Sequence, residues 1–263
     1  DQLTSKNGLY DIRITGELWE THFVDHLALI TVDHPADLEV FVDERFAAHA
    51  PPAMAIHAMQ RPQPVARAWD DMGHDVTDIV RARDGRYLGT FGRGAYQGIT
   101  RDHFVEIDLG DDAAPEHAQL WLLAQGWVYP TDSSINLAIA QGTHPRPRGV
   151  ALEVRDESGT WVVVSPDLGF PAGKNKTMVI DVSGLFHPGQ ARRLRLRTNL
   201  EVYWDWLAYA EGVEPDAIVT RRLAPATAEL RYRGFSRTSQ AGPHSPELPH
   251  YNEIANTTQR WRD

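Results

Sequence analysis

The stretch RRLRLRTNLEVYWDWLAYAEG, residues 192–212, determines how the rest of the sequence is interpreted. Side chains of a β-strand alternate between its two faces, and apolar residues recur here at every second position. Trp204 and Trp206 share one parity, so the pattern predicts that both indoles pack in the core. Tyr203 and Asp205 have the other parity and are expected to face outward. The alternative is that the rings of YWDW form a platform on which sugars stack.

Several other segments alternate in the same way and predict a mainly β protein. Residues 151–164, ALEVRDESGTWVVV, are typical of a hairpin. Turn residues recur about every 8–12 positions without an amphipathic helix between them, which favours packed antiparallel sheets. The predicted fold class is a jelly-roll-like antiparallel sandwich with a smaller strand-rich N-terminal unit. Further strands are expected in GLYDIRITGELW (8–19), HFVDHLALITVDHP (22–35, with apolar residues on both faces as in a central strand), LEVFVDERF (38–46), HFVEIDLGD (103–111), AQLWLLAQGWVYP (118–130) and KTMVIDVSGLF (176–186).

Shifts in composition divide the chain into four stretches. Residues 1–60 form a strand-rich N-terminal unit, and 61–100 form a connection rich in proline and glycine. The β-sandwich covers 101–212, and an extended C-terminal segment follows over 213–263. The chain begins without methionine and ends without a recognisable terminal sequence. We therefore expect a piece of a longer protein, or a processed form.

The composition is that of a folded protein and excludes some functions. The 263 residues are 42% hydrophobic and 24% charged, enough for a sizeable core. A formal net charge of −10 argues against binding to nucleic acid, which favours a basic surface. The absence of cysteine excludes disulfides and thiolate metal sites. No apolar run reaches the ~18 residues of a membrane-spanning helix, so membrane insertion is not expected.

Residues 104–212 resemble the discoidin or galactose-binding-like β-sandwich. FVEIDLGD (104–111) is similar to the opening strand of that fold, VALEVRDESGTWVVV (150–164) to its middle hairpin, and residues 192–212 to its closing strands. The resemblance implies that Trp204 and Trp206 lie on a framework strand. It also implies ligand binding at rim loops, which here would include YPTDSSIN (129–136) and DLGFPAGKNKT (167–177).

The whole chain also resembles a β-rich module found near the C-terminus of bacterial proteins with FG-GAP or tetratricopeptide repeats. The resemblance rests on four stretches, and it implies a non-catalytic part of an exported protein, in an extracytoplasmic (periplasmic or secreted) setting. It carries no catalytic residues. The stretches are YDIRITGELWETHFVDHLALITVDHP (10–35), RDGRYLGTFGRGAYQGITRDHFVEIDLGD (83–111), GWVYPTDSSINLAIAQG (126–142) and DLGFPAGKNKTMVIDVSG (167–184).

A candidate metal site lies in THFVDHLALITVDH, residues 21–34, through His22, Asp25 and His26. Imidazole nitrogens and carboxylate oxygens suit zinc and other divalent cations. On an extended strand, however, His22 and His26 would lie about 13 Å apart, so a shared ion requires the strand to bend. The alternative is that these are hydrogen-bonded polar residues near the end of a strand.

A candidate ligand site lies in GWVYPTDSSIN, residues 126–136. Sugar recognition needs an aromatic face for the C–H side of the ring and polar groups for the hydroxyls. A turn that caps its own backbone would need the same polar residues, so that alternative stays open. The candidate ligand-binding residues are Trp127, Tyr129, Thr131, Asp132, Ser133 and Asn136.

Two further polar features favour structural roles. The loop GFPAGKNKT (169–177) contains Lys174 and Lys176 but lacks the order of residues found in a phosphate-binding loop. The stripe of Arg193, Arg195 and Arg197 is expected to be a solvated strand face, neutralised across strands by residues such as Glu153 or Glu201.

The leading hypothesis is a non-catalytic binding or scaffold module of an exported multidomain bacterial protein. Its expected partners are a glycan ligand and neighbouring domains of the same longer chain. The alternative is a hydrolase acting on polysaccharides or esters through acidic residues in a cleft between the two units, although no catalytic residue can be assigned. A purely structural spacer is a third reading. Loop carboxylates and carbonyls would also suit a structural Ca²⁺.

Overall fold

The computed structural model describes residues 5–12, 14, 24–47, 55–110, 119–186, 189, 191–240 and 247–258. The protein is mainly β and divides into two compact units. Unit 1 contains residues 1–31, 220–243 and 247–263, and unit 2 contains 32–219 with 244–246. Unit 2 includes the main sheets and the functional candidates discussed below, except the predicted metal ligands.

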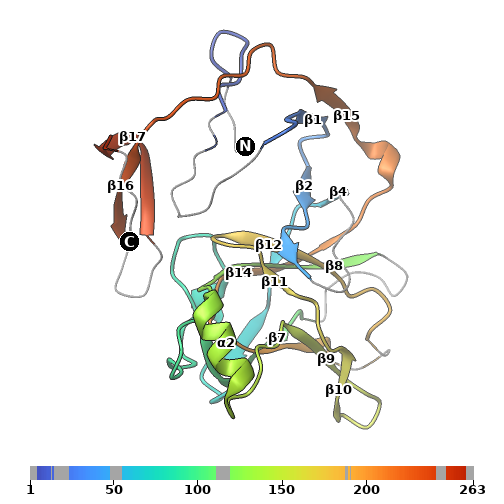
Figure 1. The fold of residues 1–263 in the computed structure, drawn as a ribbon. Coiled ribbons are helices and arrows are strands. Elements are labelled where there is room, and N and C mark those ends of the chain that lie inside the picture. Colours follow the sequence, from blue (N-terminus) through green and yellow to red (C-terminus); the bar gives the residue numbers. More distant parts are fainter. Residues whose placement is uncertain are drawn as a thin grey trace. The chain divides into compact units, whose positions relative to one another are not determined.

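Unit 2 is an antiparallel β-sandwich, and Figure 1 shows β7, β9 and β10 in one layer and β8, β12 and β14 in the other. This confirms the predicted mainly β class and the predicted hairpin, which is formed by β9 and β10. The five-stranded sheet has the order β10 (Trp161–Ser165), β9 (Ala151–Arg155), β13 (Arg193–Leu200), β7 (Ile99–Asp108) and β6 (Arg67–Asp70). The four-stranded sheet has the order β12 (Lys176–Asp181), β8 (Leu120–Val128), β14 (Val202–Glu211) and β5 (Gln63–Pro64).

The main core lies between these two sheets. Leu194 and Leu196 of β13 are fully buried, as their alternation with arginine predicts. They belong to one apolar cluster with Leu122 of β8 and with Trp204 and Leu207 of β14. Each buried leucine of this kind stabilises the fold by about 1.5–3 kcal/mol through removal of apolar surface from water.

The four-stranded sheet is covered on its other face as well. Two short strand pairs lie in this part of unit 2, one of β2 (Leu38–Val42) with β4 (Ile56–Gln60) and one of β3 (Arg45–Phe46) with β11 (Phe170–Pro171). Met59 of β4 is completely buried in a second apolar cluster, which also contains Trp206 and Ala208 of β14. Strand β14 is therefore buried on both faces.

A β-bulge in β14 overturns the predicted orientation of YWDW. Trp204 pairs with Gly126 and Trp206 with Gln125, so Asp205 is an extra residue between them. The extra residue reverses the alternation, and the two indoles enter different clusters instead of sharing a face. Both are buried, as predicted.

The expectation that Tyr203 and Asp205 face solvent is wrong, because the second face of β14 is covered. Their exposed fractions are 4% and 3%. Tyr203 packs against aromatic side chains, and the Asp205 carboxylate accepts a hydrogen bond of 2.9 Å from the Gly85 backbone N–H.

In the described part of the chain, helices interrupt the strands at three places, which the sequence pattern does not predict. They are α1 (Thr77–Val80), α2 (Ser133–Gln141) and the 3₁₀ turn η1 (Pro215–Ala217). Helix α2 begins at Asp132, whose side chain accepts the Ile135 N–H at 2.8 Å, a standard N-cap. One side chain of α2, Ile139, is buried in the main core. The apolar face of α2 is too narrow for its residues to recur in the sequence with the spacing typical of a helix.

Among the described residues, unit 1 contains the strand pair of β16 (Phe235–Gln240) with β17 (Glu247–Asn256) and most of the pair of β1 (Leu29–Asp33) with β15 (Val219–Leu223). The prediction of a central strand over 22–35 is wrong for its described part, residues 24–35, because β1 pairs with a single strand among those described and Ile30 is 49% exposed. The strand predicted over 8–19 is absent from its described part, residues 8–12 and 14. Tyr10 and Ile14 there are exposed, so no apposed sheet stabilises the extended pattern.

We expect Gly126→Ala to lower the free energy of unfolding by about 1–3 kcal/mol, the usual cost of overpacking a core. A Cβ at this position would lie 2.4 Å from the Tyr203 carbonyl oxygen, where the bulge brings the two backbones together. Urea denaturation measures the effect. Gly142→Ala is the matched control, since the nearest atom to its Cβ would be the Ala138 oxygen at 3.0 Å, at an exposed helix end. Equal stability of the two variants would contradict the bulge geometry.

Candidate functional site

An aromatic cluster covers the second face of the four-stranded sheet beside the bulge. It consists of Tyr87, Phe91, Trp127 and Tyr203. Trp127 and Tyr203 stack with ring centroids 4.7 Å apart and an interplanar angle of 11°, while Phe91 meets Tyr203 edge-on at 5.2 Å. Stacked and T-shaped pairs of this kind contribute about 0.5–1.5 kcal/mol beyond burial alone. The packing of these rings therefore holds the cluster rigidly against the sheet.

A buried carboxylate fixes the Tyr203 ring. The Tyr203 hydroxyl donates to Glu201 Oε1, and Glu201 Oε2 accepts the Gly98 N–H at 3.1 Å. Burial, together with the hydrogen bond to the Glu201 carboxylate, raises the pKa of Tyr203, so the phenol stays neutral. Glu201 thus holds the ring in place. It does not neutralise the arginine stripe, for which the sequence pattern had offered Glu153 or Glu201.

Gly98 connects the loop over the aromatic cluster to the sheet. The Gly98 carbonyl accepts the Glu201 N–H at 2.9 Å, and its φ of +80° suits glycine. A Cβ at Gly98 would lie 2.7 Å from the Tyr129 oxygen. The loop therefore approaches the end of β8 as closely as backbone allows.

The exposed rim of the aromatic cluster joins the two loops that the sequence predicts as ligand-binding rims. The Val128 N–H donates to the Gly173 oxygen at 3.3 Å, and the Tyr87 hydroxyl donates to Asn175 Oδ1 at 2.7 Å. Tyr129 is 37% exposed and contacts Trp127 edge-on at 5.5 Å. Lys174 is partly buried in the same loop, and burial lowers the pKa of its ammonium group. Aromatic and polar groups are thus adjacent here.

The predicted ligand residues differ in their exposure and in their structural roles. Trp127 is 3% exposed and lies beneath the surface, whereas Tyr129 is at the rim. Asp132 caps α2 and accepts the Ser134 hydroxyl at 2.6 Å, so it serves the turn-capping alternative. Thr131 precedes that cap and is half-buried, while Ser133 and Asn136 are exposed in the first turn of α2.

The predicted metal ligands lie in unit 1. His22 is outside the described residues. Asp25 and His26 are exposed, and His26 Nε2 is 2.8 Å from an Arg222 guanidinium nitrogen, which makes this imidazole nitrogen an acceptor. Within the described ranges, no three histidine or carboxylate side chains gather as a metal site would require.

The arginine stripe forms an ionic and aromatic lattice on the outer face of the five-stranded sheet. Arg195 donates to Glu106 Oε2 at 2.8 Å, and its guanidinium lies between the rings of Phe104 (4.0 Å) and Trp161 (3.9 Å). Arg197 pairs with Glu153 at 2.8 Å, as expected from the sequence. The lattice satisfies these charges within the sheet itself, which supports a structural role.

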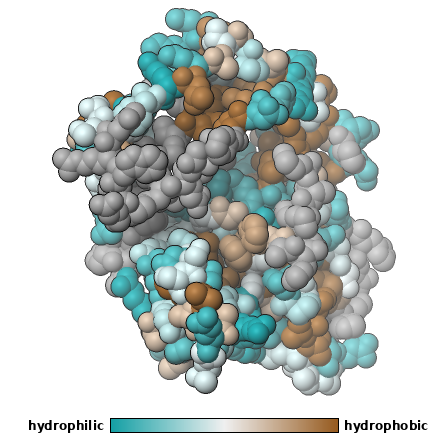
Figure 2. Space-filling view, in the orientation of Figure 1, coloured by the Kyte–Doolittle hydropathy of each residue, from teal (hydrophilic) through white to brown (hydrophobic). Residues whose placement is uncertain are grey.

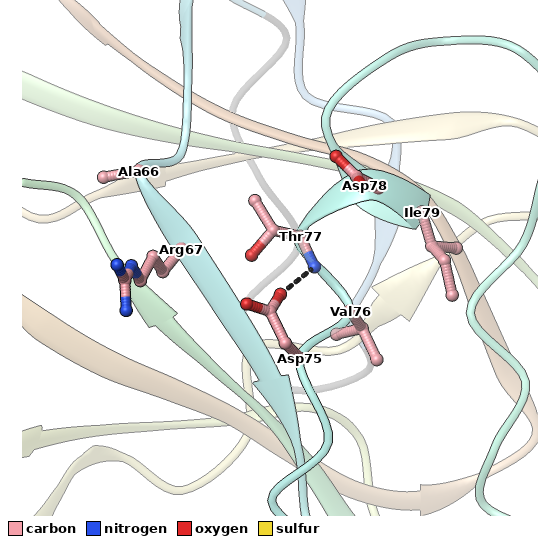
Figure 3. Close-up of a pocket in the computed structure, with 7 residues that line it drawn as sticks. All are labelled: Ala66, Arg67, Asp75, Val76, Thr77, Asp78 and Ile79. Atoms are coloured by element: carbon pink, nitrogen blue, oxygen red, sulfur yellow. Dashed lines mark hydrogen bonds between the residues drawn. The ribbon is translucent and has the colours of Figure 1, made fainter.

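Figure 3 shows an open pocket lined by residues of β6 and α1 and of the segments that precede them. The Thr77 N–H donates to Asp75 Oδ1 at 2.9 Å, and hydrogen bonds from Thr77 lower the pKa of Asp75. A carboxylate held in its ionised form cannot donate a proton near neutral pH, which makes it unsuitable as a general acid. The lining residues are Ala66, Arg67, Asp75, Val76, Thr77, Asp78 and Ile79.

Asp205 is a carboxyl group whose pKa is raised by burial. It lies beside Arg83, whose guanidinium stacks 3.8 Å from the Trp206 ring and whose own pKa is lowered by burial. With 3% exposure and a hydrogen bond from Gly85, Asp205 anchors the 83–87 segment to β14.

Comparisons with known proteins add no identification. Neither the scan against protein-family models nor the search of curated proteins matches this chain. In the described part of the chain, no helix combines the length and apolarity needed to span a membrane.

Arg195→Lys is expected to cost about 1–2 kcal/mol of stability, because lysine lacks the planar group that stacks between two rings while donating to a carboxylate. Chemical denaturation monitors the loss. Arg81→Lys is the control, since Arg81 is an exposed residue with a 3.4 Å ion pair, and we expect a change within about 0.5 kcal/mol. If the contacts of Arg195 contributed nothing to stability, both variants would have the same free energy of unfolding, which would contradict this prediction.

His103 predicts a pH dependence of stability. Its ring stacks on Phe91 at 4.5 Å, and burial lowers its pKa below the ordinary 6.5. At pH values between the lowered pKa of the folded protein and the ordinary pKa of 6.5, the unfolded chain binds more protons than the folded one. The free energy of unfolding therefore decreases as pH falls through this range. Urea titrations from about pH 8 to about pH 5 test this. His103→Phe retains a ring for stacking and should flatten the profile; parallel profiles would contradict the assignment.

Proposed function

We propose that unit 2 is a non-catalytic carbohydrate-binding module and that its ligand binds the exposed rim of the aromatic cluster. One observation carries the proposal: the Val128 N–H bonds to Gly173 of the 169–177 loop, and the next residue, Tyr129, is 37% exposed and packs edge-on against the buried Trp127. An exposed ring with planar polar neighbours is the combination that sugar recognition uses.

The chemistry of the rim supports a polyhydroxylated ligand. The Tyr129 ring provides an apolar surface for the C–H face of a sugar. Asn175 is exposed and offers amide donors and acceptors, while Lys174 adds an ammonium donor. The buried stack of Trp127 on Tyr203 keeps the rim rigid, which reduces the entropic cost of binding.

The proposed setting is an exported, multidomain bacterial protein in which this chain is one module. The resemblance of residues 104–212 to galactose-binding-like sandwiches supports it, since those folds bind ligands at rim loops. The resemblance to modules of FG-GAP or tetratricopeptide-repeat proteins supports an extracytoplasmic setting with neighbouring domains as partners.

The hydrolase alternative stays a prediction. It needs two carboxyl groups with separated pKa values that are open to a substrate. Asp205 has the raised pKa such a site uses, but its burial and its role as an anchor favour the binding module.

A glycan array with the wild type, followed by isothermal titration calorimetry on the best ligand, tests the proposal. Tyr129→Ala is expected to weaken binding about tenfold, since a lost stacking contact is worth on the order of 1 kcal/mol. Tyr251→Ala is the matched control, because Tyr251 is 53% exposed on β17 and should leave affinity unchanged. Trp127→Ala is unsuitable because it would open a cavity. A wild type that binds no glycan, or a Tyr129→Ala variant that binds normally, would overturn the assignment.

A further inference from the structure

We propose that His103 is an acid-sensitive switch, which holds the segment of residues 91–98 against β14 at neutral pH and releases it when the imidazole is protonated. The inference rests on the proposed function, because this segment supports the glycan-binding rim. It adds a regulation of that site, namely loss of the ligand in acid.

The hydrogen bonds of His103 leave no place for a second proton. Its Nδ1 atom lies 3.0 Å from the Arg101 carbonyl oxygen and 3.1 Å from the Thr100 hydroxyl. Its Nε2 atom is buried and has no hydrogen-bond partner among the described residues. A neutral imidazole fits this arrangement with its proton on Nδ1, whereas an imidazolium carries an N–H on each nitrogen. Protonation therefore creates a buried donor without an acceptor, which is costly until water reaches it.

The charged groups near His103 do not compensate for this donor. Asp71 and Asp102 favour the protonated form, and Arg101 opposes it. Both carboxylates are already engaged by arginines, Asp71 by Arg101 at 2.9 Å and Asp102 by Arg197 at 2.7 Å. Burial outweighs these charges and lowers the pKa of His103. The neighbours on its other sides carry no charge and are Phe91 of the covering segment and Thr198 of β13.

The stack of Phe91 on His103 holds the covering segment in place. The two rings lie 4.5 Å apart at an interplanar angle of 29°, and Phe91 also meets Tyr203 at 5.2 Å. Phe91 is the one buried residue of 91–97, and the segment contains no helix or strand. A segment with so few buried contacts opens locally at a low cost in free energy.

Gly98 links the covering segment to the rim. Its N–H donates to the buried Glu201 carboxylate, which also accepts the Tyr203 hydroxyl. Its backbone lies so close to Tyr129 that an added Cβ would be 2.7 Å from the Tyr129 oxygen. Water that reaches the buried imidazole nitrogen must displace Phe91, which uncovers Tyr203 and loosens the segment beside Tyr129. The ligand then loses its rigid rim.

The strength of the switch follows from proton binding. With the segment open, His103 is hydrated and has an ordinary pKa near 6.5, whereas with the segment closed its pKa is lower. Each pH unit below about 6.5 therefore raises the ratio of open to closed molecules by up to about tenfold, until the closed form also binds a proton. The apparent affinity for the ligand falls in proportion to the fraction of closed molecules.

Hydrogen–deuterium exchange of the full chain without ligand, from about pH 7.5 to about pH 4.5, tests the switch itself. His103→Phe keeps a ring under Phe91 but does not titrate, and His103→Gln is a second variant that does not titrate. Relative to both variants at the same pH, exchange over 91–98 of the wild type is expected to rise by up to about tenfold per pH unit. Strands β8 and β14 should stay protected.

His144→Phe is the matched control. His144 also contacts the covering segment, through Tyr96 at 4.8 Å, but it is exposed and therefore hydrated. Figure 2 shows mostly teal and white surface at the lower left, where Figure 1 places α2, the helix that ends shortly before His144. This variant should open in acid like the wild type. Exchange that rises equally in His103→Phe and His103→Gln, or a segment that opens only when the whole sandwich unfolds, would overturn the proposal.

Isothermal titration calorimetry with the best glycan from the array, at about pH 7.5 and about pH 5, tests the regulation of binding. The affinity of the wild type is expected to fall at least about fivefold in acid, and that of His103→Phe to stay within about twofold. An equal loss in both proteins would overturn the regulation. If the segment opens in acid but no glycan binds at either pH, the proposed function fails while the switch stands.

Discussion

The burial of β14 on both faces is the constraint on which the rest of unit 2 depends. One face contributes Trp204 and Leu207 to the core between the sheets, and the other contributes Tyr203 and Trp206 to separate clusters. A strand of this kind needs cover on both sides. The β2–β4 pair and the 81–98 segment therefore belong to the fold as much as the two main sheets do.

The polar groups beneath this cover are placed where they satisfy buried backbone. Glu201 and Asp205 both lie on or next to β14, and both accept backbone N–H groups of the covering segment, at Gly98 and Gly85. A buried carboxylate without such donors would cost several kcal/mol. These two residues thus anchor the covering segment to β14 and fix the rings of the aromatic cluster in place.

The sequence predicted what depends on local alternation and missed what depends on a partner strand. Leu194 and Leu196 are in the core as expected, because arginine on the opposite face leaves one arrangement for β13. The sequence did not predict which face of β14 each side chain of YWDW points to. The bulge depends on the close approach of Gly126 in β8, and a single sequence does not show that pairing. Tyr10 and Ile14 alternate well, yet they form no strand because none of the described strands pairs with this segment.

The candidate site was predicted in part for the same reason. The resemblance to galactose-binding-like sandwiches pointed to the 129–136 and 167–177 loops as rims, and the aromatic and polar composition of 126–136 marked a ligand site locally. Tyr87 and Glu201 could not be identified, because the fold brings them to the aromatic cluster from distant parts of the chain. Their signals, a tyrosine after a glycine turn and a glutamate at the start of a strand, are common in any β protein.

The extra residue at position 205 has an evolutionary consequence. In a relative that lacks it, each residue from Trp206 to Ala210 would exchange one apolar environment for the other, so their sizes would have to change together. Single substitutions could not cross between the two arrangements without passing through poorly packed intermediates. A one-residue gap at this position in a family alignment would therefore mark an ancient division between lineages.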